Sequence, residues 1–167
     1  MKARIAGIKK HSLVNGPGVR MTIFFQGCIH HCNGCQNPDT WSADGGVIYD
    51  TDDIIRMIKD DRYIDGITLS GGDPLLQPDA AAAIAQASKQ LDLSVWCYTG
   101  WSYEEIKQDP DLYNKCSRLF RYVDVLVDGR FLQEKKSSDC IYRGSINQRL
   151  IDIRKTEKEK CIYEISI

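Results

Sequence analysis

Segments with a strand pattern alternate with segments of helical periodicity, and this order restricts the possible folds more than any other feature of the chain. Short runs rich in β-branched and aromatic residues predict five strands, at residues 4–8, 19–25, 66–70, 93–98 and 123–127. Apolar residues at helical spacing predict helices from a cap at Thr51, at 79–91, at 103–108 and around 112–120. Because a helix between two strands joins parallel neighbours, the pattern predicts an α/β fold with a parallel sheet and outer helices.

The length of the chain decides between versions of this fold. A complete eight-fold barrel takes about 250 residues, whereas this chain has 167. We therefore expect an incomplete parallel (βα) barrel or an open, curved parallel sheet. No shift in composition marks a boundary, and 43% of the residues are hydrophobic, which is enough for one core of ordinary size. A single domain over residues 1–167 is predicted.

Glycine and polar residues follow the predicted strands, where folds of this kind bind ligands. Directly after strands come Gly27 and Cys28, the turn of residues 71–74, the pair at 99–100 and the pair at 128–129. The carboxyl ends of parallel strands share one edge of the sheet, so these residues are expected to gather around one ligand site.

Charge and hydropathy exclude several kinds of partner. The formal net charge is -1 and Lys and Arg are scattered, so no broad basic face for nucleic acid is expected. No apolar run approaches the roughly 18 residues of a membrane span, and Lys9 and Lys10 help to interrupt the stretch that a signal peptide would need. We expect a cytoplasmic protein that binds neither nucleic acid nor membrane. In that compartment its seven cysteines favour metal or redox chemistry over disulfides.

Three of the cysteines, Cys28, Cys32 and Cys35, are crowded into one loop rich in Gly, Asn and Pro. Their spacing lets one short loop wrap around a metal centre, since thiolates bind both zinc and iron–sulfur clusters. A structural zinc needs a fourth ligand, such as His30, His31 or a distant cysteine. A [4Fe-4S] cluster held by three cysteines instead has one iron without a protein ligand, and that iron can hold a substrate. On spacing alone both centres remain open.

The cysteine spacing and the glycine-rich turn after a strand are together typical of radical S-adenosylmethionine enzymes. The motifs that narrow the match are "NGPGVR", "FFQGCIHHCNGCQNPDTW", "LSGGDPL", "TGW", "VLVDGRF" and "RGSINQR". In this order, over residues 14–151, they resemble the family of activating proteins of the anaerobic ribonucleoside-triphosphate reductase. The turn "GGDP" alone is weak support, because a plain strand-to-helix turn uses the same residues. Its pairing with the cysteines makes the match specific.

The resemblance implies a radical S-adenosylmethionine domain with a [4Fe-4S] cluster, which cleaves S-adenosylmethionine reductively. In this family the resulting 5'-deoxyadenosyl radical removes a hydrogen atom from a backbone glycine of the reductase, which then carries a glycyl radical. The implied partners are the large subunit of the anaerobic ribonucleoside-triphosphate reductase and a flavodoxin or ferredoxin as electron donor. The cluster and cofactor carry the difficult chemistry, while the protein supplies geometry, exclusion of water and a docking surface.

The resemblance also assigns roles to individual residues. Those that match the family's cluster ligands are Cys28, Cys32 and Cys35. Those that match its S-adenosylmethionine contacts are Gly34, Cys35, Gln36, Gly71, Gly72 and Asp73. Many members of the wider superfamily have an aromatic residue at the position of Gly34, so here the adenine contact must come from elsewhere. No side chain is assigned as an acid or base.

Several other residues have simpler interpretations. His30 and His31 lie on a polar loop, where we expect them to be solvated or to face a partner. Cys97 lies in a strand and Cys116 on an apolar helix face, where cysteine is usually a small buried hydrophobe. The tryptophans are expected to pack in the core or at its rim, and they are Trp41, Trp96 and Trp101.

The tail after Gly129 is harder to interpret. Cys140 and Cys161 lie there, and an auxiliary metal site built from them is one alternative. Arg143 and Asn147 belong to the "RGSINQR" motif, where they would hold the cofactor's carboxylate, meet the partner or simply form a turn. These three alternatives remain open.

Two other functions compete with the activating role. A small radical S-adenosylmethionine enzyme of the carboxy-deazaguanine synthase type would modify a free metabolite instead of a protein. A zinc-stabilised interaction module would carry out no catalysis. The motifs "VDGRF" and "RGSINQR" favour the activating family over the first alternative. The second leaves the glycine-rich rim opposite the cysteines unexplained.

Overall fold

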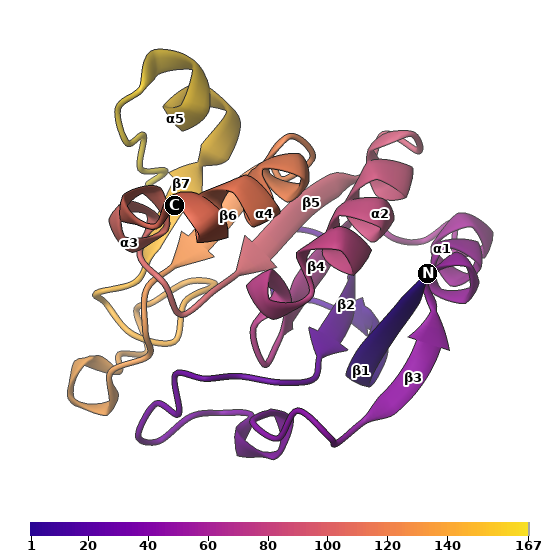
Figure 1. Cartoon of the computed structure of the whole chain (residues 1–167), viewed down its shortest axis with the longest axis horizontal. Coiled ribbons are helices and arrows are strands. Elements are labelled where there is room, and N and C mark those ends of the chain that lie inside the picture. Colours follow the sequence, from indigo (N-terminus) through magenta and orange to yellow (C-terminus); the bar gives the residue numbers. More distant parts are fainter. Residues whose placement is uncertain (167) are drawn as a thin grey trace.

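A computed structural model describes residues 1–166, which build one seven-stranded sheet with helices against it (Figure 1). The strands are β1 (Lys2–Ser12), β2 (Arg20–Phe25), β3 (Val47–Asp50), β4 (Gly66–Gly71), β5 (Ser94–Tyr98), β6 (Val125–Asp128) and β7 (Arg149–Asp152). They lie in the order β3-β1-β2-β4-β5-β6-β7. The α-helices are α1 (Thr51–Asp60), α2 (Pro78–Lys89), α3 (Tyr103–Gln108), α4 (Pro110–Phe120) and α5 (Ile153–Glu159). No helix within the described residues is long and apolar enough to cross a lipid bilayer.

The four central strands confirm the predicted α/β fold with an open sheet. β2, β4, β5 and β6 are parallel neighbours, and α1, α2 and α4 lie in a row across one face of the sheet (Figure 1). The sheet is parallel at its centre and antiparallel toward both sides, because β1, β3 and β7 pair antiparallel. β1 and β2 are joined only by residues 13–19, and a parallel pair would need a longer crossover of a dozen or more residues.

Three elements were not expected from the sequence, namely β3, β7 and α5. Both strands have four residues and lie next to polar segments, so neither shows a long apolar alternation. The cap of α1 also differs from the prediction. Asp50, and not Thr51, is the N-cap, and its carboxylate accepts a hydrogen bond from the Asp52 N–H at 3.2 Å.

The two faces of the sheet carry separate sets of side chains because strand residues alternate in direction. On β5, Val95 and Cys97 pack in the core beneath the helices. Trp96 points to the opposite face, where it packs with Val125, Val127 and Leu150. Cys97 and Cys116 are both fully buried, which confirms the prediction that they are small hydrophobic core residues.

Arg20 is a fully buried arginine at the start of β2. Its guanidinium donates to Thr68 Oγ1 at 2.7 Å, to Ser94 Oγ at 2.8 Å, and to three backbone carbonyls. It also lies over the ring of Trp96, 5.6 Å from the centroid. Burial lowers its pKa to about 10, so the group stays charged at neutral pH. Through the carbonyl of Pro17, Arg20 holds the turn of residues 15–18 against the sheet.

We expect Arg20→Ala to lower the free energy of unfolding by about 2–3 kcal/mol, because it leaves a cavity and several buried acceptors without a donor. Urea denaturation of the metal-free protein measures the change. Arg62→Ala is the matched control, since Arg62 is exposed and its loss should cost no more than about 0.5 kcal/mol. Equal losses in the two variants would show that Arg20 does not anchor the fold.

Candidate functional site

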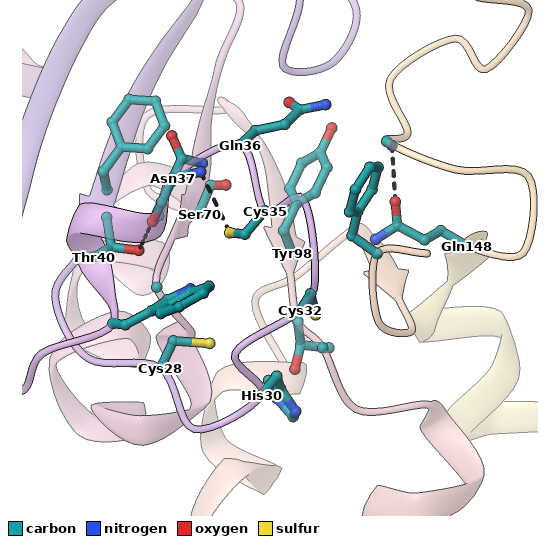
Figure 2. A pocket seen from close by; sticks show the side chains of 18 of the residues that line it. Cys28, His30, Cys32, Cys35, Gln36, Asn37, Thr40, Ser70, Tyr98 and Gln148 are labelled. Carbon is teal, nitrogen blue, oxygen red and sulfur yellow. Dashed lines mark hydrogen bonds between the residues drawn. The ribbon is translucent and has the colours of Figure 1, made fainter. Parts of the chain in front are cut away.

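A cavity lies at the carboxyl ends of the parallel strands, and residues of the two long segments 26–46 and 129–148 form part of its lining (Figure 2). Its space, counted out into the open mouth, amounts to about 830 Å³. Residues from the predicted rim line it, among them Cys28, Gly71, Gly72, Thr99, Gly100 and Gly129. The prediction that one ligand site forms at this edge of the sheet agrees with this arrangement.

The three loop cysteines lie around the same cavity. Cys28, Cys32 and Cys35 are all half-buried, unpaired with one another and exposed to the cavity they line (Figure 2). Burial raises the pKa of the Cys28 thiol above its ordinary value. A metal that binds there must therefore displace a proton. Thiols brought together without a disulfide are suited to soft metals and iron–sulfur clusters.

Backbone and amide hydrogen bonds close the cysteine loop at its base. The Gly27 N–H donates to the Thr40 carbonyl at 2.8 Å, and the Cys28 N–H donates to the Trp41 carbonyl at 3.1 Å. The buried side chain of Gln26 donates to two carbonyls on the returning part of the loop, at 3.0 and 2.7 Å. Both ends of the loop are thus fixed on the end of β2.

The turn after β4 fits closely against the start of this loop. The Gly72 N–H donates to the Phe25 carbonyl and the Asp73 N–H to the Gly27 carbonyl, both at 2.8 Å. A Cβ atom on Gly72 would lie 2.2 Å from the Gly27 oxygen, so only glycine fits there. Gly71 has a φ of +101°, a conformation that glycine adopts without strain. Both glycines expose backbone to the cavity.

The carboxylate of Asp73 is fully buried and bonds within the protein. Its Oδ1 accepts from the Leu75 N–H at 3.0 Å, and its Oδ2 accepts from Thr99 Oγ1 and the Gly100 N–H, both at 2.9 Å. The Oδ2 atom also lies 3.0 Å from His30 Nε2. Asp73 is not among the residues that line the cavity. Its side chain joins the turn after β4 to the turn after β5.

The two loop histidines differ from each other in the structure. The expectation that His30 is solvated or faces a partner is wrong, because its side chain is 3% exposed and packs edge-on against Trp101. Its bond to a buried carboxylate accounts for this burial. His31 is exposed and stacks on Trp41, with 4.8 Å between ring centroids.

The segment after β6 supplies the remaining wall of the cavity. Gln148 lines this wall, and its amide donates to the Gly129 carbonyl at 2.9 Å and accepts from the Gly144 N–H at 2.8 Å. Tyr98 lines the same cavity, and its hydroxyl donates to the Tyr142 carbonyl at 2.7 Å. Burial raises the pKa of Tyr98, which keeps the phenol neutral. Sequence reasoning missed both side chains, although the "RGSINQR" motif contains Gln148.

Known proteins are similar in sequence to this chain over most of its length. A family described as "4Fe-4S single cluster domain" matches residues 14–151. The anaerobic ribonucleoside-triphosphate reductase-activating protein of Vibrio cholerae is 39% identical over 145 residues, covering 81% of this chain and 89% of that protein. The chain belongs to this family of activating proteins.

Two further members of the family are similar over comparable lengths. The activating protein of Haemophilus influenzae is 38% identical over 144 residues, covering 81% of this chain and 89% of that protein. The one from Enterobacteria phage T4 is 34% identical over 143 residues, covering 82% and 86%. In addition, the crystal structure of QueE from Escherichia coli has a TM-score of 0.47 and 15% identity, over 60% of this chain and 53% of that chain.

The donor set of the loop suits the cluster that the family description names. Three thiols line one cavity, together with the backbone of Gly71 and Gly72 and the phenol of Tyr98. Within residues 1–166, no three His, Cys, Asp or Glu side chains lie close enough to hold one metal ion. Cys28, Cys32 and Cys35 are the residues that would hold a cluster, which supplies one-electron chemistry when bound.

The other residues predicted for cofactor contact lie at different places around the site. Gln36 lines the cavity, as do Gly71 and Gly72. Gly34 is exposed, has a φ of +72° and lies next to the side chain of Gln133. Gly34 does not line the cavity. Its positive φ instead shapes the backbone of the loop just before Cys35.

The residues left open in the tail lie outside the lining of the cysteine cavity. Arg143 donates to the Gln148 carbonyl at 3.0 Å, and the Asn147 amide donates to the Arg130 carbonyl at 2.8 Å. These bonds correspond to the turn-forming alternative, and neither residue lines the cavity of the cysteines. Cys140 and Cys161 line two different hollows, and that of Cys140 adjoins the main cavity. Of the three tryptophans, Trp41 lines the main cavity, whereas Trp96 lies in the core and Trp101 packs against it.

Proposed function

We propose that the chain activates an anaerobic ribonucleoside-triphosphate reductase by reductive cleavage of S-adenosylmethionine at a [4Fe-4S] cluster. One observation carries the proposal: three unpaired thiols of one loop and the glycine turn after β4 line a single cavity, in a chain of the activating family. The proposal treats residues 1–167 as one radical S-adenosylmethionine domain.

We assign Cys28, Cys32 and Cys35 as the cluster ligands. Three thiolates leave one iron of a [4Fe-4S] cluster without a protein ligand. We assign S-adenosylmethionine to the cavity that this loop and the turn after β4 line together, where the backbone of Gly71 and Gly72 is open to a ligand. Asp73 supports that turn from behind through its buried carboxylate. Cys35 and Gln36 complete the proposed contacts from the cysteine loop, and Gly34, which was also predicted to contact the cofactor, lies beside Cys35 outside the lining of the cavity.

The electrons and atoms of this reaction balance with one external reductant. A cluster held by Cys28, Cys32 and Cys35 would supply the one electron, drawn from a flavodoxin or ferredoxin, that breaks a C–S bond of S-adenosylmethionine. The products are methionine and a 5'-deoxyadenosyl radical. That radical takes one hydrogen atom from a backbone glycine of the large reductase subunit, giving 5'-deoxyadenosine and a glycyl radical.

The proposal assigns no acid or base, because neither step moves a proton through a side chain. The chain contributes position: the loop presents the thiols, and the strand-end turns present backbone groups to the cofactor. We propose that the protein is cytoplasmic and that it binds the large reductase subunit and a flavodoxin or ferredoxin there.

An anaerobic reconstitution tests the proposal. The purified protein is loaded with iron and sulfide, reduced and mixed with S-adenosylmethionine, and 5'-deoxyadenosine is measured by chromatography. We expect cleavage, and a glycyl-radical spectrum by electron paramagnetic resonance when the large reductase subunit is added.

Two other outcomes would contradict the proposal in different ways. Cleavage without any glycyl radical on the reductase would favour an enzyme that acts on a free metabolite. A colourless protein that takes up zinc but forms no iron–sulfur cluster would favour an interaction module. A parallel sample without reductant is the control, since cleavage there would not depend on electron transfer.

A further inference from the structure

The stretch between the first two loop thiols is attached to the body of the protein by one buried side chain. His30 lies between Cys28 and Cys32, and its ring is almost fully enclosed. Its Nε2 atom lies 3.0 Å from Asp73 Oδ2, so the Nε2–H group donates to the carboxylate. The hydrogen bonds that close the loop at its base involve other residues, from Gln26 to Trp41.

Asp73 connects this histidine to two strand-end turns at once. The aspartate itself belongs to the turn after β4, directly behind Gly71 and Gly72. The same carboxylate oxygen that meets His30 accepts from Thr99 and Gly100, which follow β5. All these groups are buried or half-buried, where hydrogen bonds to a charged acceptor are worth more than at the surface.

The packing around the ring leaves little freedom for another arrangement. A Cβ atom on Gly100 would lie 2.3 Å from His30 Cδ2, so the backbone of the turn after β5 approaches the ring directly. Trp101 packs against the ring edge-on, with 4.4 Å between centroids and an angle of 81°. His30 is therefore held by the hydrogen bond of its Nε2 atom to Asp73 and by contacts of its ring with Gly100 and Trp101.

We propose that His30 is a positioning residue, whose bond to Asp73 fixes the thiols of Cys28 and Cys32 relative to the glycine turn that faces the cofactor. This inference rests on the proposed function, because the position of the thiols affects activity only if they hold a cluster at a fixed distance from S-adenosylmethionine on the glycine turn. Without the bond, the base of the loop stays closed and the Asp73 N–H still holds the Gly27 carbonyl, but the stretch from His30 to Cys32 loses its hydrogen bond to the two turns.

Two substitutions separate the hydrogen bond from the packing. His30→Phe keeps a ring against Trp101 but removes the donor, and Asp73 retains its bonds to Thr99 and Gly100. His30→Gln removes the ring but keeps an amide donor of similar reach. His31→Phe is the matched control, because this neighbouring ring is exposed and has no bond to Asp73.

Binding of S-adenosylmethionine to the reduced cluster is measured from the change that it causes in the electron paramagnetic resonance spectrum. We expect His30→Phe to weaken this binding by about tenfold or more, as occurs when groups that orient metal ligands are removed. His30→Gln and His31→Phe should stay within about threefold of the unmodified protein, a difference well below one tenfold step of 1.4 kcal/mol. Thermal melting of the metal-free variants confirms that each is folded.

A second measurement needs no cluster. Alkylation of the metal-free protein, followed by mass spectrometry, gives the rate at which each thiol reacts. In His30→Phe the thiols of Cys28 and Cys32 should react faster relative to Cys161, an exposed internal reference. The His30→Gln and His31→Phe variants should keep the original ratios.

The outcomes distinguish this inference from the proposed function. If the unmodified protein forms no cluster or cleaves no S-adenosylmethionine, the proposed function fails, while the alkylation ratios still decide whether His30 fixes the loop. If the unmodified protein is active, and His30→Phe binds S-adenosylmethionine and is alkylated at the same rates as the unmodified protein, the inference about His30 is wrong while the proposed function stands. Equal damage in His30→Phe and His30→Gln also overturns it, because packing and not the hydrogen bond would then hold the loop.

A further variant covers the case in which His30→Phe does not fold. Gly100→Ala places a methyl group where the His30 ring lies, so the ring must move although the histidine is retained. It should produce the same faster alkylation of Cys28 and Cys32 and the same loss of cofactor binding. Unchanged alkylation ratios in a folded Gly100→Ala protein would overturn the inference.

Discussion

Cys32→Ala is expected to abolish cleavage of S-adenosylmethionine, with 5'-deoxyadenosine no higher than in a blank without protein. Cys32 is the middle thiol of the loop and lines the cavity together with Cys28 and Cys35. Two thiols cannot hold a [4Fe-4S] cluster in the arrangement that leaves a single iron open. Iron and sulfide per chain, measured after anaerobic reconstitution, should fall together with the activity.

The matched control is Cys161→Ala, because Cys161 is exposed and lines a hollow away from the site. It should retain both the cluster and the cleavage activity of the unmodified protein. Cleavage by Cys32→Ala at a rate close to that of the control would show that the loop is not the ligand set. Loss in both variants would indicate that handling, and not ligation, destroys the cluster.

The centre of the fold is predictable because its signals are local and strong. The helix at Tyr103–Gln108 has its predicted bounds, and it carries a capping box between Ser102 and Glu105. The predicted strand at residues 66–70 is β4, which ends one residue later at Gly71. Such segments show their periodicity in the sequence itself, and the structure only has to bring them together.

The edges of the sheet are harder to predict because long-range pairing decides them. β3 pairs with β1, and β7 pairs with β6 across a long irregular segment. Four residues give too short a pattern to reveal a strand. The direction of an edge strand follows from the path of its connection, which no local pattern contains.

The site shows the same division between local and distant information. The cysteine loop and the glycine turn are visible in the sequence because each is one contiguous motif. The roles of His30 and Gln148 depend on partners far along the chain, at Asp73 and Gly129. From the sequence, a histidine on a polar loop is therefore predicted to be solvated, because the buried carboxylate that binds it lies far along the chain.

A methyl group at the turn after β4 should damage both the fold and the site. Gly72→Ala is expected to lower the free energy of unfolding by about 3 kcal/mol, the upper range for overpacking. Its Cβ atom would lie 2.2 Å from the Gly27 oxygen and 2.8 Å from the Gly27 carbonyl carbon. Because both are backbone atoms, the strain cannot be relieved by turning a side chain. Urea denaturation of the metal-free protein measures the loss.

The same strain must separate the turn after β4 from the start of the cysteine loop, since the Asp73 N–H donates to the carbonyl of Gly27. Cleavage of S-adenosylmethionine by Gly72→Ala should therefore disappear even at temperatures where the variant is folded. Gly7→Ala is the matched control, because a Cβ atom there would meet no heavy atom within 4 Å. If Gly72→Ala were as stable and as active as Gly7→Ala, the turn and the loop would not be packed as the structure has them, and the cavity between them would lose its basis as the cofactor site.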